Sequence, residues 1–187
     1  MRKRIITSIS LLTILALMLC GIGCNKNGTD KKDSNQKQPP TENQVIDKEI
    51  TLYFSDDQAM YLIAEKRIIQ IEENATDEQL IKNIVEKLIK GPENQTLIPT
   101  IPPETKLLTV EIENQLAKIN FSQEIQTKHW GGSTGELMTV NSLVNSITEL
   151  DTIEEVLILV EGEIQESLIG HLYTKEPFTR DEKTIRK

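Results

Sequence analysis

Few side chains in this sequence have the types and spacing that nucleophilic, acid–base or metal chemistry needs. Among 187 residues there are two cysteines, Cys20 and Cys24, and two histidines, His129 and His171. Both cysteines lie near the amino terminus, so neither a disulfide framework nor a thiolate metal site is available further along the chain. Ser133 has no nucleophile-elbow sequence that would make it a hydrolase serine beside His171. We therefore expect no catalytic residue, no metal site and no cofactor.

One short segment, His129–Ser133, suggests binding of a ligand or partner. Ser133 and Glu136 have the spacing of a capping box, so a helix is expected to begin here. Backbone N–H groups at a helix start favour an anion, and an exposed Trp130 would anchor an interface. A purely structural alternative is that the glycines permit a tight entry into the helix while Trp130 covers a sheet edge. The candidate interface or ligand cleft consists of Trp130, Gly131, Gly132 and Ser133.

Hydrophobic periodicity predicts the elements that must position this segment. Thr76 and Gln79 form a capping box before a first helical stripe, which the Gly91-Pro92 pair ends. A second helical stripe runs from Leu137 to Leu150. Alternating or continuous apolar residues indicate strands at 50–54, 61–71, 108–112, 117–121 and 156–160, with a short strand at 163–165.

The resulting order, β-β-α-β-β-α-β, predicts an α+β fold. We expect a two-layer sandwich in which a mixed β-sheet carries two helices on one face. The folded domain is predicted at residues 50–180, followed by a polar tail at 181–187. Residues 24–49 are polar and nearly free of apolar side chains, so they should form a disordered tether. The acidic pair Asp56-Asp57 is expected to be solvated in a turn.

Residues 1–23 have the layout of a secretory signal peptide. Met1–Arg4 is basic, and the residues from there to Gly23 are uncharged and mostly apolar. The end of this run, Gly21–Cys24, resembles a bacterial lipobox, in which a small residue precedes the cysteine that becomes the lipidated amino terminus. The resemblance implies lipidation at Cys24 and attachment to the extracytoplasmic face of the cell membrane. An uncleaved apolar anchor and secretion without a lipid are the alternatives.

The charge balance excludes one class of partner. The chain has a formal net charge of −8. Nucleic-acid binding needs clustered cations that neutralise phosphates, so we expect no nucleic-acid partner. The same acidic surplus disfavours adsorption of the folded domain onto anionic lipid. A protein or a neutral ligand remains.

Seven fragments in order give the folded region a resemblance to the GerMN domain family. They are Tyr53–Asp56, Leu62–Arg67, Leu88–Pro92, Ile101–Thr105, Ala117–Ser122, Ser146–Glu149 and Val156–Gly162. The resemblance implies a fold akin to the ring-building motifs of sporulation and secretion assemblies. It also implies a role in the envelope of spore-forming or related bacteria, and it brings no catalytic residues.

The functional expectation joins the anchor to this domain. We expect an extracytoplasmic lipoprotein whose non-catalytic binding or scaffold domain acts in a cell-envelope assembly during sporulation or germination. Its partner would be an envelope or sporulation-complex protein, or another copy of the chain. The first surface to consider is apolar area around Trp130 and the Pro99–Pro103 loop. The alternative is an accessory lipoprotein that senses peptidoglycan or a small anion.

Overall fold

Seven strands in two sheets form the framework of the computed structural model, which describes residues 44–186. β1 (Val45–Ser55) and β2 (Leu62–Glu72) form an antiparallel pair of their own. The larger sheet has the order β3-β4-β5-β6, and β7 also pairs with β5. Its β4 and β5 are parallel and its other pairs are antiparallel, so this sheet is mixed. Its strands are β3 (Leu107–Glu113), β4 (Leu116–Phe121), β5 (Glu155–Val160), β6 (Glu163–Ile164) and β7 (Phe178–Thr179).

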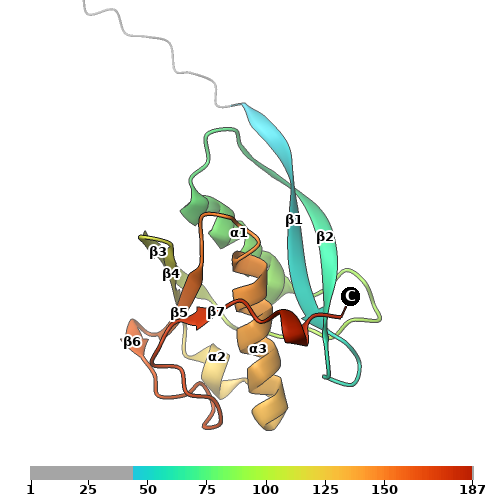
Figure 1. Ribbon diagram of the computed structural model, residues 1–187, viewed down its shortest axis with the longest axis vertical. Coiled ribbons are helices and arrows are strands. Elements are labelled where there is room, and N and C mark those ends of the chain that lie inside the picture. Colours follow the sequence, from blue (N-terminus) through green and yellow to red (C-terminus); the bar gives the residue numbers. More distant parts are fainter. Residues whose placement is uncertain (1–43, 187) are drawn as a thin grey trace, which may run out of the picture. The chain divides into compact units, whose positions relative to one another are not determined.

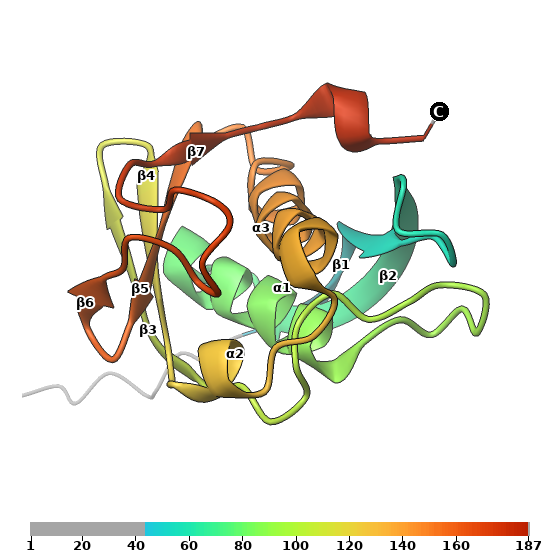
Figure 2. The same cartoon turned by 90° about the horizontal axis from the view of Figure 1, so that it is seen from below.

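The two long helices lie between the two sheets (Figures 1 and 2). α1 (Asp77–Lys90) begins at the predicted capping box, in which Thr76 accepts from the Gln79 backbone and the Gln79 side chain accepts from the Thr76 backbone. A short helix, α2 (Glu124–Thr127), precedes α3 (Gly132–Ile147). Apolar side chains of α1, α3, β1, β2, β4 and β5 form one continuous core.

The predicted α+β class and mixed sheet are confirmed, but the first two strands do not join that sheet. The reason lies at the free edge of β1. There the Tyr53 N–H donates to Ser146 Oγ (3.0 Å) and the Tyr53 carbonyl accepts from Ser142 Oγ (2.5 Å). Ser55 exchanges two backbone hydrogen bonds with Ile98. These contacts occupy the groups that a further strand would need, so α3 closes this edge.

Both predicted ends of the domain differ from the structure. β1 begins at Val45, so the last residues of the expected tether are strand. Those residues are exposed on both faces, which leaves no burial alternation for a pattern to reveal. The expected polar tail is also ordered, because it forms a 3₁₀-helix, Glu182–Thr184, and the Arg186 N–H then donates to the Leu62 carbonyl. Within residues 44–186, no helix is long and apolar enough to cross a membrane.

Candidate functional site: an apolar pocket beside Trp130

The start of α3 is built by glycines rather than by a side-chain cap. Gly131 is the N-cap residue with φ 90°, and no side chain caps the helix. The predicted capping box of Ser133 and Glu136 is therefore wrong. A Cβ on Gly135 would lie 2.4 Å from the Trp130 carbonyl oxygen, so the helix approaches the Trp130 backbone more closely than any side chain allows. This tight approach fixes Trp130 against the first turn of α3.

A pocket of about 180 Å³ lies between this turn and the loop after α1. Trp130 and Ile98 stay 42% and 41% exposed, so the pocket opens on an apolar surface. Met60, which follows a lining residue in the chain, is also exposed. The pocket is lined by Ser55, Ala59, Ile98, Pro99, Thr100, Trp130, Gly131, Thr134, Gly135, Met138 and Thr139.

A chain of hydrogen bonds holds the two walls of the pocket together. The Thr139 hydroxyl lies 2.5 Å from the Thr100 carbonyl and 3.0 Å from the Gly135 carbonyl, and it can donate only its single proton to them. The Thr139 oxygen is then an acceptor for His129 Nε2 at 2.8 Å. This arrangement requires a proton on Nε2, and burial lowers the pKa of His129 although the nearby Glu136 charge opposes that effect. His129 thus acts as a structural hydrogen-bond donor to Thr139.

The four predicted site residues share one turn but have different surroundings. Trp130 and Gly131 line the pocket. Gly132 and Ser133 are exposed at the helix start and do not belong to the lining. The structure adds Ile98, and Pro99 brings the second predicted surface, the proline-rich loop Pro99–Pro103, against the first. Cys24, the predicted lipidation site, lies outside the described residues.

Glu136, predicted as a capping residue, is fully buried and organises a different segment. Its carboxylate accepts hydrogen bonds from the Ser167 hydroxyl and from four backbone N–H groups between Leu168 and Leu172, at 2.8–3.1 Å. Burial raises the pKa of Glu136, but the donated hydrogen bonds, from Ile169 foremost, outweigh burial and lower it. One charged side chain of α3 therefore fixes the loop that follows β6.

Asp56 is a further correction to the sequence analysis. It is buried rather than solvated, and its carboxylate accepts from the Met60 N–H (2.8 Å), the Tyr61 N–H (3.2 Å) and Arg186 (3.1 Å). Burial raises the pKa of Asp56, yet these hydrogen bonds and the Arg186 charge lower it by more. The Asp-Asp pair gave no signal of this role, because the Arg186 partner is 130 residues away.

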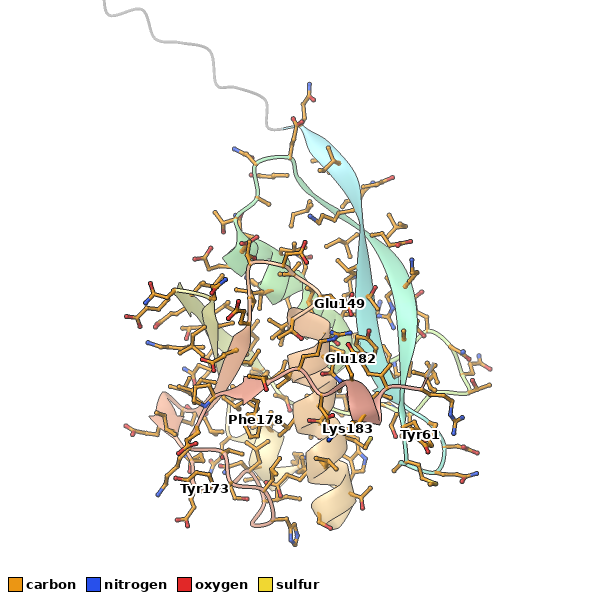
Figure 3. The ribbon with its side chains drawn as sticks, viewed as in Figure 1. Tyr61, Glu149, Tyr173, Phe178, Glu182 and Lys183 are labelled. Carbon is orange, nitrogen blue, oxygen red and sulfur yellow. The ribbon has the colours of Figure 1, made fainter. Side chains whose placement is uncertain are left out.

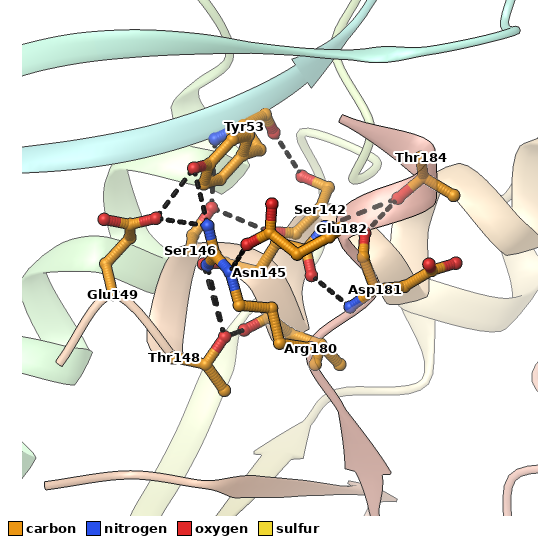
Figure 4. A network of polar contacts seen from close by, with 11 residues as sticks. Tyr53, Ser142, Asn145, Ser146, Thr148, Glu149, Arg180, Asp181, Glu182 and Thr184 are labelled. Atoms are coloured by element: carbon orange, nitrogen blue, oxygen red, sulfur yellow. Dashed lines mark hydrogen bonds and ion pairs between the residues drawn. The ribbon is translucent and has the colours of Figure 1, made fainter. Parts of the chain in front are cut away.

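The carboxyl-terminal segment, residues 178–186, is tied to α3 and β1 by a polar network (Figure 4). Asn145 makes two hydrogen bonds with the backbone of Asp181, at 2.9 and 3.1 Å. Arg180 bonds the Asn145 carbonyl, the Tyr53 hydroxyl and Glu149 at 2.6–2.9 Å. In Figure 3 the segment runs from Phe178 across α3 toward Tyr61, where Arg186 lies over the tyrosine ring. Within the described residues, no group of acidic, histidine or cysteine side chains could hold a metal ion.

The architecture is that of a GerMN domain. The tandem GerMN domains of the sporulation protein GerM from Bacillus subtilis align with a TM-score of 0.56 and 20% identity, over 74% of this chain and 46% of that chain. The first GerMN domain of the same protein aligns with a TM-score of 0.52 and 18% identity, over 73% and 98%. The chain thus spans about half of the tandem structure.

The model of the Germane family (sporulation and spore germination) matches residues 51–166. The chain therefore belongs to this family. A protein from Clostridium perfringens that is provisionally described as a lipoprotein is 29% identical, with a TM-score of 0.51 over 71% of this chain and 87% of that one. A search among curated proteins finds no match. The family match ends before the loop that Glu136 holds and before the carboxyl-terminal segment.

Proposed function

We propose that this protein is a lipid-anchored binding module on the extracytoplasmic face of the cell membrane, and that it joins an envelope assembly in sporulation or spore germination. Its family supports the process, and the likeness to the Clostridium perfringens protein supports the anchor. In this proposal Cys24 carries the lipid, and the domain acts by binding a protein rather than by catalysis.

One observation carries the binding role: the exposed Trp130 at the mouth of an apolar pocket. The pocket is large enough for one apolar side chain, and its walls are fixed by the hydrogen bonds of Thr139. A rigid pocket pays little ordering entropy when a partner binds, and tryptophan concentrates binding energy at interfaces. The pocket lining is mainly apolar, which favours a protein side chain over a small anion.

Complementation of cells that lack the protein tests this proposal. Trp130→Ala should remain in the membrane fraction but fail to restore sporulation or germination, because losing a central tryptophan weakens an interface by about 2 kcal/mol or more, roughly thirtyfold in Kd. Tyr173→Ala is the matched control, since Tyr173 is an exposed aromatic residue that does not line the pocket. Full restoration by Trp130→Ala would contradict the binding role.

The anchor has a separate readout. Cys24→Ala should move the protein out of the lipid-modified pool, measured by metabolic labelling with a fatty acid. Labelling that persists in Cys24→Ala would contradict lipidation at that residue. Because labelling and complementation are measured independently, failure of the anchor does not disguise failure of the binding role.

A further inference from the structure

The outer edge of β3 is open. β3 is the terminal strand of the larger sheet, and its two-residue turn at Asn114 and Gln115 makes Glu113 and Leu116 a hydrogen-bonded pair. Hydrogen-bonded pairs alternate along the ladder, so the N–H and C=O groups of Val110 and Ile112 point away from β4. Within residues 44–186, no hydrogen bond satisfies these groups.

A groove accompanies this edge. It has a volume of about 200 Å³ and lies between the first turns of α1 and the amino-terminal half of β3. Leu108, which is 44% exposed, provides apolar surface on the strand side. The helix side is polar, and the groove is lined by Glu78, Gln79, Lys82, Leu107, Leu108, Thr109 and Val110. An edge strand beside a helix is the geometry in which an extended peptide adds to a sheet.

The charges at this edge select the occupant. Glu78 and Lys82 both line the groove, whereas the exposed Glu111, which follows the groove residue Val110, faces the opposite side of the sheet. On that opposite face Glu111 and Glu113 share one cation, Lys118, which lies across from Glu111 on β4 and 2.6 Å from Glu113, so this face keeps an acidic surplus. A second copy of the chain would bring the same acids and a net charge of −8 to the interface. Like charges facing each other across strands are destabilising, so a basic partner fits better.

We propose that β3 receives an extended segment of a partner protein as an added strand, with aliphatic side chains facing the groove and lysine or arginine side chains on the opposite face, toward Glu111. This surface shares no residue with the Trp130 pocket, so it goes beyond the binding role proposed above. The backbone of β3 provides the hydrogen bonds, and the acids provide the preference for basic sequence.

Amide NMR of the chain from residue 24 onward, carrying Cys24→Ala, tests the proposal with a synthetic heptapeptide of alternating valine and lysine. Saturation should shift the amides from Leu108 to Glu113 and slow exchange of the Val110 and Ile112 amides at least about tenfold. The same peptide with proline in place of valine, which cannot donate in the ladder, should have no effect. No shifts at millimolar peptide, or shifts at Trp130 or in the open part of β1 near Glu49, would overturn the proposal.

Two variants separate backbone pairing from charge. Val110→Pro removes an outward N–H without removing a β3–β4 hydrogen bond, and it should abolish the shifts. Glu111→Lys changes no backbone group and should weaken binding of the lysine peptide roughly tenfold, whereas Glu104→Lys, at an exposed loop residue, should not. If Val110→Pro unfolds, the comparison of Glu111→Lys with Glu104→Lys still tests the proposal. Equal binding of the lysine peptide by Glu111→Lys and Glu104→Lys would contradict the proposal of a basic partner. Self-association of the chain through β3 without peptide would also contradict it.

Discussion

β1 and β3 each have an edge that pairs with no further strand, but the backbone groups of these two edges have different surroundings. At Tyr53 and Ser55 the outward N–H and C=O groups of β1 bond to serines of α3 and to Ile98. At Val110 and Ile112 the outward groups of β3 face no partner within the described residues. Buried polar side chains of α3 therefore close the edge of β1, whereas the edge of β3 stays available for pairing with another strand.

Amide hydrogen exchange gives the largest expected contrast between the edges. The Tyr53 amide should exchange at least about a thousandfold more slowly than the Val110 amide, because its hydrogen bond opens only when α3 leaves the strand. Exchange resolved by residue in the unliganded chain measures both rates at once. Similar rates at Tyr53 and Val110 would remove the distinction between a closed and an open edge.

Removing the hydroxyls that close β1 should be strongly destabilising. The double variant Ser142→Ala and Ser146→Ala leaves the buried N–H and C=O groups of Tyr53 unpaired, which should lower the free energy of unfolding by about 2–6 kcal/mol. Both serines bond the same residue, so the single variants should not add to the double. Urea unfolding monitored by circular dichroism measures the change, and a loss below about 1 kcal/mol would show that α3 does not close the edge.

Substitution of Glu136 tests how a charged side chain of α3 stabilises the fold. Glu136→Gln places an amide N–H₂ group toward backbone donors, and should lower the unfolding free energy at neutral pH by about 2–3 kcal/mol. Because the folded-state pKa of Glu136 is lowered, its charge stabilises the fold above the ordinary glutamate pKa, and that contribution is lost as pH falls through the folded value. The difference between wild type and variant should therefore shrink in acid, and a pH-independent difference would contradict this assignment.

Asn145 tests how α3 holds the carboxyl-terminal segment. Asn145→Ala removes two hydrogen bonds to the Asp181 backbone and should cost about 1–2 kcal/mol. Loss of these bonds should also expose residues 178–186 to carboxypeptidase before global unfolding, which mass spectrometry of limited digests detects. Lys183→Gln, at an exposed residue of the same segment, is the control that should leave trimming nearly unchanged.

Ser133→Ala should have the smallest effect on the free energy of unfolding, and it tests whether Ser133 caps α3. Its hydroxyl caps nothing, so the free energy of unfolding should change by less than about 0.5 kcal/mol. Thr76→Ala, at the real capping box of α1, should lower it by about 1 kcal/mol and serves as the reference. A loss of similar size in both variants would restore the capping role that the sequence suggests for Ser133.

Local patterns predicted the parts of this fold in which burial follows a regular period. The helix that Thr76 caps and the β3–β4 hairpin agree with the alternation and capping signals in the sequence. The exposed first residues of β1 show no such alternation, and the short β7 has too few residues for a period. Both strands exist because partners distant in sequence supply their hydrogen bonds.

The candidate site was predictable only in outline. Trp130 and the proline-rich loop were recognisable as separate features, because a lone tryptophan and a cluster of prolines stand out in any sequence. Their meeting in one pocket depends on Thr139, which bonds the loop carbonyl of Thr100 from α3. That threonine carries no signal, since a hydroxyl on a helix usually points to solvent.

The sequence by itself determined the family, the α+β class, the two main helices and the poverty of reactive side chains, because composition and period are local properties of the chain. Only the tertiary structure determined the burial and hydrogen-bond partners of Glu136 and Asp56, and it also determined that the edge of β1 is closed and that of β3 open. Each depends on which polar group a side chain or a strand meets after folding. A hydrogen bond across many residues leaves no spacing in the sequence to detect.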